Sequence, residues 1–188
     1  MSLLTYLEDS AALIRHAATP EMAGQVDRAI DCIAAALSAD LPLLVCGNGG
    51  SASDAMHIAG ELVGRFLKER RALNCIALSA DQAIITAWSN DYSYETVFSR
   101  QVEAYGRAGG VLLGLSTSGN SANVIKAAEA AKAKGMTVIG LTGKGGGKLK
   151  DRCDILIEAP SNSTPHIQQV HICLYHYICD KVEAKIAG

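Results

Sequence analysis

The run LPLLVCGNGGSASDAMH, at residues 41–57, carries the strongest signal for the fold. It starts with a short continuous apolar stretch, which is typical of a strand buried on both faces of a parallel sheet. Three glycines follow and allow a tight turn, and the residues after them have helical spacing. A buried strand, a glycine turn and a helix together indicate one unit of an alternating α/β fold.

The same alternation recurs along the rest of the chain. We expect four more strands, at residues 73–79, 111–116, 136–142 and 154–159. We expect helices at about residues 51–66, 82–88, 93–105, 121–134, 147–152 and 165–187. Strands that alternate with helices in this way predict a parallel sheet with helices on both faces, and ligands bind such sheets beyond the carboxyl ends of the strands.

Two helices are predicted before the first strand. Thr19 and Pro20 are typical of an N-cap followed by a proline at the first helical position, which separates the two helices. Apolar residues recur at helical spacing in both: Leu3, Leu7, Ala11, Ile14, Met22, Val26, Ile30, Ile33 and Leu37. Such a pair would leave an apolar stripe uncovered. We therefore expect one domain over residues 1–188, in which residues 1–38 serve oligomerisation and residues 39–188 form the α/β unit.

The composition narrows the possible function classes. Of 188 residues, 49% are hydrophobic and only 19% are charged, and the formal net charge is −2. The length suits one domain, and no basic stripe is available for general nucleic-acid binding. No apolar run approaches the roughly 20 residues that span a bilayer, and the first residues lack the basic segment of a signal peptide. Six cysteines without a CxxC pair favour reduced thiols, so we expect a cytoplasmic protein.

The glycine turn after the first strand is a candidate ligand site, because glycines allow a ligand to approach the backbone. Gly47-x-Gly49-x-x-Ala52 also matches the loose dinucleotide-binding pattern. The acidic residue that should bind the ribose is missing at the usual distance, since Asp81 lies 34 residues after Gly47. The missing acidic residue disfavours NAD binding. The alternative to any ligand site here is a glycine turn with a purely structural role.

A second candidate loop follows the third strand, where STSGNS occupies residues 116–121. Hydroxyl groups beside a helix N-terminus can hold a phosphate without a lysine. The simpler alternative is an N-cap in which Ser121 alone caps the helix. The Walker pattern GxxxxGK[ST] is absent from the sequence, and residues 142–147 are expected to form a turn rather than a second phosphate site.

Two groups of side chains could do chemistry. His57 and Glu61 are four residues apart on one predicted helix face, and Gln168 and His176 share a stripe of the last helix, with His171 beside it. This set of nitrogen and oxygen ligands suits a zinc ion. For each histidine, the alternative is an ordinary hydrogen-bonded side chain without a metal. We expect His16 and His166 to be surface residues.

A carboxylate and an imidazole that face a sugar phosphate predict proton transfer next to a carbonyl, as in an aldose–ketose isomerisation. Asn90 and Asp91, in a predicted polar turn, could bind sugar hydroxyls, or could form an ordinary turn.

Five motifs in order resemble the phosphoheptose isomerase family of the sugar isomerase (SIS) superfamily. They cover most of the chain: CGNGGSASDAMHIAGELVGRF at 46–66, SNDYSYETVFSRQVEA at 89–104, STSGNSANVIKA at 116–127, TGKGGGKL at 142–149 and TPHIQQVHICLYH at 164–176. The resemblance implies a flavodoxin-like, three-layer α/β/α sandwich with a five-stranded parallel sheet. It also implies a homotetramer with active sites between subunits.

The resemblance further implies an activity and residue roles. The family converts sedoheptulose 7-phosphate to D-glycero-D-manno-heptose 7-phosphate, the first step towards ADP- or GDP-heptose for lipopolysaccharide and other glycoconjugates. Glu61 and His176 would be the acid–base pair, and one zinc ion per subunit would be held by His57, Glu61, Gln168 and His176. The substrate would contact Asn48, Gly49, Gly50, Glu61, Asn90, Asp91, Ser116, Thr117, Ser118, Ser121 and Gln168.

The chain departs from the family pattern at Gly60, Pro165 and Gln169. These departures concern the expected recognition of sugar hydroxyls, and none of them removes an expected metal ligand. The main alternative is a non-catalytic SIS tetramer that binds a replication initiator protein. As the resemblance implies, such relatives lack the glutamate and the late histidine that this chain keeps as Glu61 and His176. A sugar-phosphate sensor of the same superfamily is a third reading, but such sensors usually carry a DNA-binding domain.

Overall fold

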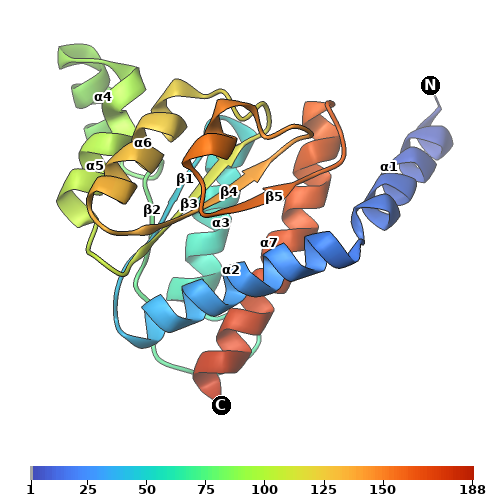
Figure 1. The fold of residues 1–188 in the computed structure, drawn as a ribbon, viewed down its shortest axis with the longest axis horizontal. Coiled ribbons are helices and arrows are strands. Elements are labelled where there is room, and N and C mark those ends of the chain that lie inside the picture. The colour runs from blue at the N-terminus through green and yellow to red at the C-terminus, as the bar shows by residue number, and fades with distance from the viewer. Residues whose placement is uncertain (1) are drawn as a thin grey trace.

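The computed structural model describes residues 2–188, in which five strands alternate with helices (Figure 1). The strands are β1 (Leu43–Cys46), β2 (Cys75–Ala77), β3 (Val111–Ser116), β4 (Thr137–Thr142) and β5 (Ile155–Glu158). The helices are α1 (Leu3–Ala17), α2 (Pro20–Ser38), α3 (Gly50–Val63), α4 (Gln82–Asp91), α5 (Val97–Tyr105), α6 (Ala122–Ala133) and α7 (Thr164–Ala187), with short 3-10 helices η1 (Tyr94–Thr96) and η2 (Gly147–Arg152). The predicted strands and helices are confirmed, with small shifts at their ends.

The sheet is parallel throughout and has the order β2-β1-β3-β4-β5. This is the flavodoxin-like order of doubly wound sheets. Helices α2, α3 and α7 cover one face, and α4, α5 and α6 cover the other (Figure 1). The predicted three-layer sandwich is therefore confirmed. Strands β1 and β3 are neighbours, so the loops that follow them leave the sheet side by side.

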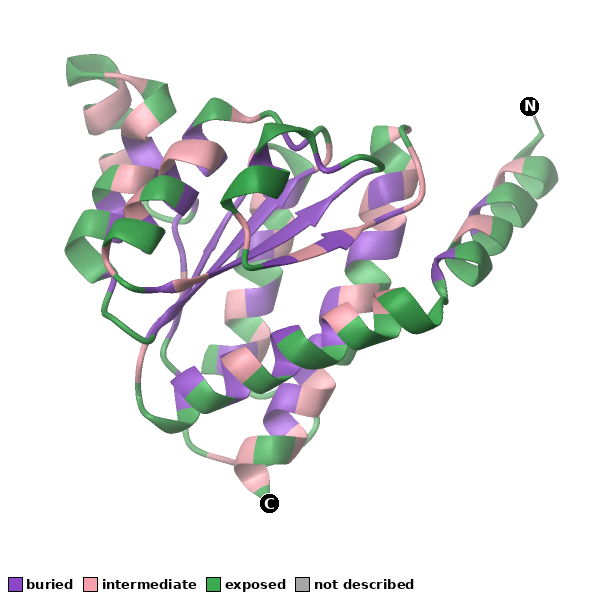
Figure 2. Cartoon of the chain, viewed as in Figure 1, coloured by how far each residue is buried: buried purple, intermediate pink, exposed green. Residues whose placement is uncertain are grey.

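Two hydrophobic clusters fill the spaces between the layers, because successive strand residues point to opposite faces. In β1, Leu43 and Val45 join the cluster under α2, α3 and α7, whereas Leu44 and Cys46 join the cluster under α5 and α6. Figure 2 shows the strands buried along most of their length. Burial on both faces explains why these strands appear as continuous apolar runs in the sequence.

The two N-terminal helices differ in their surroundings. The apolar stripe of α2 is buried in the first cluster, whereas α1 extends away from the body of the molecule (Figures 1 and 2). Leu3, Leu4 and Leu7 of α1 are 74%, 68% and 55% exposed. Tyr6 attaches α1 to α7 by stacking on His166, which is half-buried and not the surface residue that we predicted. The sequence alone does not show this contact, because it joins residues far apart in the chain.

Helix α7 is the longest, with 24 residues, and it packs against both α2 and α3. Its His171 is fully buried and its Nε2 lies 3.1 Å from the carbonyl oxygen of Thr142. Burial lowers the pKa of His171 to about 4, so this histidine is a neutral core residue. Among residues 2–188, no helix combines the length and the apolar character needed to cross a membrane.

Candidate functional site

The glycine turn after β1 is shaped by close backbone packing. A Cβ atom at Gly47 would lie 2.6 Å from the carbonyl oxygen of Ser51, and Gly49 has a φ of +56°. A Cβ atom at Gly50 would lie 2.5 Å from Nε2 of Gln168 on α7. Gly47 and Gly49 therefore favour glycine, whereas a side chain at Gly50 would displace the end of Gln168. The turn brings the N-terminus of α3 against α7.

Asn48, in the middle of that turn, is held in one orientation by three hydrogen bonds. Its side-chain amide exchanges two hydrogen bonds of 2.9 Å with the amide of Asn123 on α6. The hydroxyl of Tyr94 donates to Oδ1 of Asn48 at 2.7 Å. These bonds connect the loop after β1 to the start of α6. Our sequence analysis missed Asn123 and Tyr94. The available signal for Asn123 was an asparagine among apolar residues of a predicted helix, and the structure buries it.

The hydroxyl loop after β3 lies at the N-terminus of α6, as predicted. The Oγ atoms of Ser116 and Ser121 are 3.0 Å apart, and Oγ of Ser118 accepts a hydrogen bond from the backbone N–H of Asn120. Ser121 occupies the N-cap position, but its side chain makes no capping hydrogen bond, which contradicts the simpler alternative that Ser121 alone caps the helix. Its hydroxyl faces Ser116 instead, which leaves the first N–H groups of α6 free of a side-chain cap from Ser121. The backbone N–H of Gly143 donates to the carbonyl oxygen of Thr117 and ties the loop after β4 to this one.

Three side chains from α3 and α7 converge on one point. Nε2 of His57 lies 3.0 Å from Oε1 of Glu61 and 3.5 Å from Nε2 of His176. One ligand-type atom from each of the three residues lies within 4.8 Å of the other two. The side chains of His57 and Glu61 are 41% and 23% exposed, so solvent and substrate can reach the group. The ring of Phe66 packs against His176, with centroids 5.9 Å apart.

The donor set and its spacing fit a tetrahedrally coordinated metal ion such as zinc. Zinc binds imidazole nitrogen and carboxylate oxygen at about 2.0–2.2 Å, so two ligands of a tetrahedral ion lie about 3.4 Å apart. The separations of His57 from Glu61 and from His176 are close to this value. Gln168 lies beside Gly50, two turns before His176, and within residues 2–188 no hydrogen bond joins it to the three-residue group. Its predicted role as a ligand stays a prediction.

Asn90 and Asp91 form the exposed last turn of α4, which extends three residues beyond the predicted end. The predicted polar turn is therefore wrong at this place, because the helix continues through both residues. The amide of Asn90 donates to Oδ1 of Asp91 at 2.9 Å.

A buried carboxylate holds the segment that follows α3. Glu183 of α7 accepts hydrogen bonds from the backbone N–H groups of Phe66, Leu67 and Lys68, at 2.8, 2.6 and 2.8 Å. It also forms an ion pair of 3.2 Å with Arg70, and both side chains are at most 3% exposed. Arg70 in turn donates to the carbonyl oxygens of Glu61 and Gly64. We call these two residues and their contacts the Glu183 clamp, and the sequence analysis missed it.

Comparisons with known proteins identify relatives of this chain in sequence and in fold. A family model described as the SIS domain matches residues 5–143. A phosphoheptose isomerase from Rhodospirillum rubrum is 53% identical over 163 residues, which are 87% of each chain. The structure of a phosphoheptose isomerase from Neisseria gonorrhoeae matches with a TM-score of 0.90 and 40% identity, over 97% of both chains. One from Francisella tularensis matches with a TM-score of 0.91 and 35% identity, over 98% of this chain and 100% of the other.

The family model matches more than half of the chain, and the doubly wound sheet has two candidate ligand loops at adjacent strand ends. The chain therefore belongs to the SIS-domain family. Within it, the extent of the match shows that the chain belongs to the phosphoheptose isomerase family and is a sugar-phosphate isomerase. The resemblance drawn from the five motifs is confirmed, and the non-catalytic alternative has no support from these relatives.

Proposed function

We propose that this isomerase interconverts sedoheptulose 7-phosphate and D-glycero-D-manno-heptose 7-phosphate, as the first step towards a nucleotide-activated heptose. The observation that carries the proposal is the convergence of His57, Glu61 and His176 in a chain whose relatives are named phosphoheptose isomerase. The group provides a carboxylate and two imidazoles near an open surface, which are the groups that proton transfer next to a carbonyl needs. The downstream use in lipopolysaccharide and the cytoplasmic location stay predictions.

The substrate would bind between the two loops. Ser116, Thr117, Ser118 and Ser121 would hold the phosphate together with the N-terminus of α6, because hydroxyls and free N–H groups both donate to an anion. His57 lies seven residues, about 10 Å along the helix axis, from the N-terminus of α3. The sugar would lie along this half of α3, with its phosphate at the loop after β3 and its carbonyl end at the three-residue group. The sugar hydroxyls would be contacted by Asn48, Gly49, Gly50, Asn90, Asp91 and Gln168.

Glu61 would take the proton from C1 of the ketose and return it to C2, through an enediol. His176 would move a proton from the C1 hydroxyl to the C2 carbonyl oxygen, so that the atoms balance. In a separate state of the site, His57, Glu61 and His176 would hold a zinc ion, which when bound polarises a carbonyl oxygen. The two roles belong to different states, because metal ligation and general-base duty compete for the Glu61 carboxylate. The position of Gln168 beside Gly50 favours contact with the substrate.

We further propose that the chain assembles as a homotetramer with active sites between subunits, and that residues 1–38 take part in the contacts. The support is the apolar surface of α1, where Leu3, Leu4 and Leu7 are exposed on a helix that extends away from the body. A small exposed cluster of leucines of this kind favours burial against another surface.

The deciding experiment is an assay of the purified protein on sedoheptulose 7-phosphate, with and without a chelator. Glu61→Gln and His176→Ala should each lower kcat by at least about 10²-fold, because a positioned acid–base group contributes that much. The exposed pair Arg100–Glu103 supplies a control variant, Glu103→Gln, which should keep full activity. Near-normal turnover by Glu61→Gln would overturn the mechanism, and no turnover of this substrate by the wild-type protein would overturn the proposed function.

A further inference from the structure

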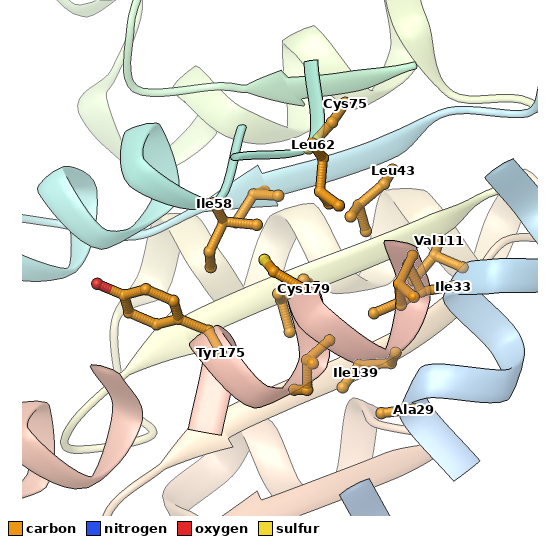
Figure 3. Close-up of a cluster of buried hydrophobic side chains, with 14 of the residues drawn as sticks. Ala29, Ile33, Leu43, Ile58, Leu62, Cys75, Val111, Ile139, Tyr175 and Cys179 are labelled. Atoms are coloured by element: carbon orange, nitrogen blue, oxygen red, sulfur yellow. The ribbon is translucent and has the colours of Figure 1, made fainter. Parts of the chain in front are cut away.

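A tyrosine of the hydrophobic core reaches the three-residue group from the side opposite to solvent. Tyr175 is 1% exposed and belongs to the cluster between the sheet, α3 and α7. Figure 3 shows its ring at the edge of that cluster, with the hydroxyl directed away from the labelled aliphatic side chains. Its Oη lies 3.1 Å from Nδ1 of His57 and 3.4 Å from Oδ1 of Asp54. The rings of Tyr175 and His57 meet edge to face, with centroids 5.4 Å apart.

The direction of the Tyr175 hydroxyl hydrogen follows from what Asp54 needs. A carboxylate can only accept hydrogen bonds, and within residues 2–188 Oδ2 of Asp54 is buried without a partner. If Tyr175 donated to His57, Oδ1 of Asp54 would lose its donor as well, and each buried acceptor without a partner is costly. A phenol is protonated at neutral pH, so the Tyr175 hydroxyl has one hydrogen to donate. The hydroxyl therefore donates to Asp54 and presents a lone pair to Nδ1 of His57.

This direction fixes the tautomer of His57. Because Nδ1 faces a lone pair of Tyr175, it must carry a hydrogen and donate it, and in the neutral ring Nε2 then keeps a lone pair. Nε2 and Oε1 of Glu61 are then two acceptors that face each other, an arrangement that a cation between them would satisfy. Nε2 is the atom that lies 3.0 Å from Glu61 and 3.5 Å from His176. The opposite tautomer would place a hydrogen on Nε2 and bond it to Glu61, which would occupy the electron pair that a metal needs.

We propose that Asp54 and Tyr175 form a relay that holds His57 with its hydrogen on Nδ1 and thereby prepares the group for a metal cation. Asp54 and Tyr175 are positioning residues, since they act through His57. Outer partners of this kind orient metal-binding histidines, and their loss costs about 10–100-fold in metal affinity. The proposal rests on that part of the proposed function in which His57, Glu61 and His176 hold a metal ion. The tautomer of His57 is nevertheless a property of the metal-free protein.

Two measurements test the relay in Tyr175→Phe, which keeps the ring in the core. The first is the zinc Kd, measured by competition with a chromogenic chelator, which should rise about 10–100-fold. The second is the ¹⁵N spectrum of the histidine rings in metal-free protein, assigned by the loss of the signals in His57→Ala. The wild type should show hydrogen on Nδ1, and the variant should shift towards hydrogen on Nε2.

Matched variants separate the relay from general packing. Asp54→Ala should weaken zinc binding. The double variant, Asp54→Ala with Tyr175→Phe, should bind zinc with the same Kd as Tyr175→Phe alone, because Asp54 acts only through Tyr175. Tyr177→Phe, on an exposed tyrosine of the same helix, should change neither measurement. Thermal unfolding of each variant shows whether the fold is retained.

The outcomes distinguish this inference from the proposed function. If the wild type binds zinc while Tyr175→Phe changes neither Kd nor tautomer, the relay is wrong and the metal site stands. Additive effects of Asp54→Ala and Tyr175→Phe would also overturn it. If the wild type binds no zinc, the metal role fails, and a wild-type His57 with hydrogen on Nε2 would refute the relay as well.

Discussion

The Glu183 clamp provides the sharpest stability prediction. Replacing Glu183 with Gln keeps the size of the side chain but removes its charge. Arg70 then stays buried without its counter-ion, and a carboxylate that accepted three backbone N–H bonds becomes a neutral amide with one acceptor oxygen. The variant therefore tests whether the clamp is a charged structural element.

The structure sets the size of the effect. Removing one partner of a buried ion pair costs about 3–5 kcal/mol, whereas an exposed pair contributes about 0–1 kcal/mol. For a domain of this size, 1 kcal/mol shifts Tm by about 2–4 °C, so Glu183→Gln should lower Tm by about 6–20 °C. Arg70 also holds the carbonyl oxygen of Glu61, and Phe66 packs on His176, so kcat should fall together with stability.

The assay is thermal unfolding followed by circular dichroism at neutral pH, with Glu103→Gln as the control for an exposed pair. Burial opposes ionisation of Glu183, but the N–H donors of Leu67, Phe66 and Lys68 together with Arg70 outweigh it and lower the pKa of Glu183. The stabilisation is then complete above the unfolded-state pKa of about 4.3 and is lost as pH falls through the lower, folded-state pKa. The difference in Tm between wild type and Glu183→Gln should shrink on acidification. A Tm shift no larger than that of the control would refute the reasoning.

Three further predictions concern the loops and α1. Ser121→Ala should raise KM for the phosphorylated sugar about tenfold at nearly unchanged kcat, because one hydrogen bond to a charged group is lost. Steady-state kinetics measure both constants, and an unchanged KM would show that the phosphate does not bind at Ser121. Asn123→Ala should lower kcat/KM by releasing the Asn48 amide, and unaltered kinetics would contradict the role of that pair. Leu4→Glu combined with Leu7→Glu should reduce the size of the oligomer in analytical ultracentrifugation while the circular dichroism spectrum stays the same; an unaffected oligomer would exclude this surface as the contact.

Local sequence patterns were enough to predict the strands and helices and the part of the site that lies on α3. Continuous apolar runs identified the strands, because a strand buried on both faces needs apolar residues at every position. His57 and Glu61 were predicted to lie together because four residues bring side chains to the same face of a helix. Both features depend on short stretches of sequence.

The wrong predictions arose where distant residues compete for a side chain. A cap on α6 was the alternative role considered for Ser121, but its hydroxyl pairs with Ser116 at the end of β3. Likewise His166 was expected at the surface, but Tyr6 of α1 covers it. Local propensity describes what a residue can do, and the fold decides which partner it finds.

The packing of α7 along α3 brings together predicted site residues and the Glu183 clamp, which the sequence analysis missed. Gln168 reaches Gly50 at the start of α3, His176 reaches His57 in its middle, and Glu183 reaches the segment that follows its end. Intervals of seven or eight residues correspond to about two helical turns, so these side chains fall along one stripe of α7. The two helices therefore run in the same direction, and one interface positions the glycine turn, the three-residue group and the Glu183 clamp together. A change in the register of α7 would displace all three at once, which explains how a helix far along the chain governs chemistry that begins on α3.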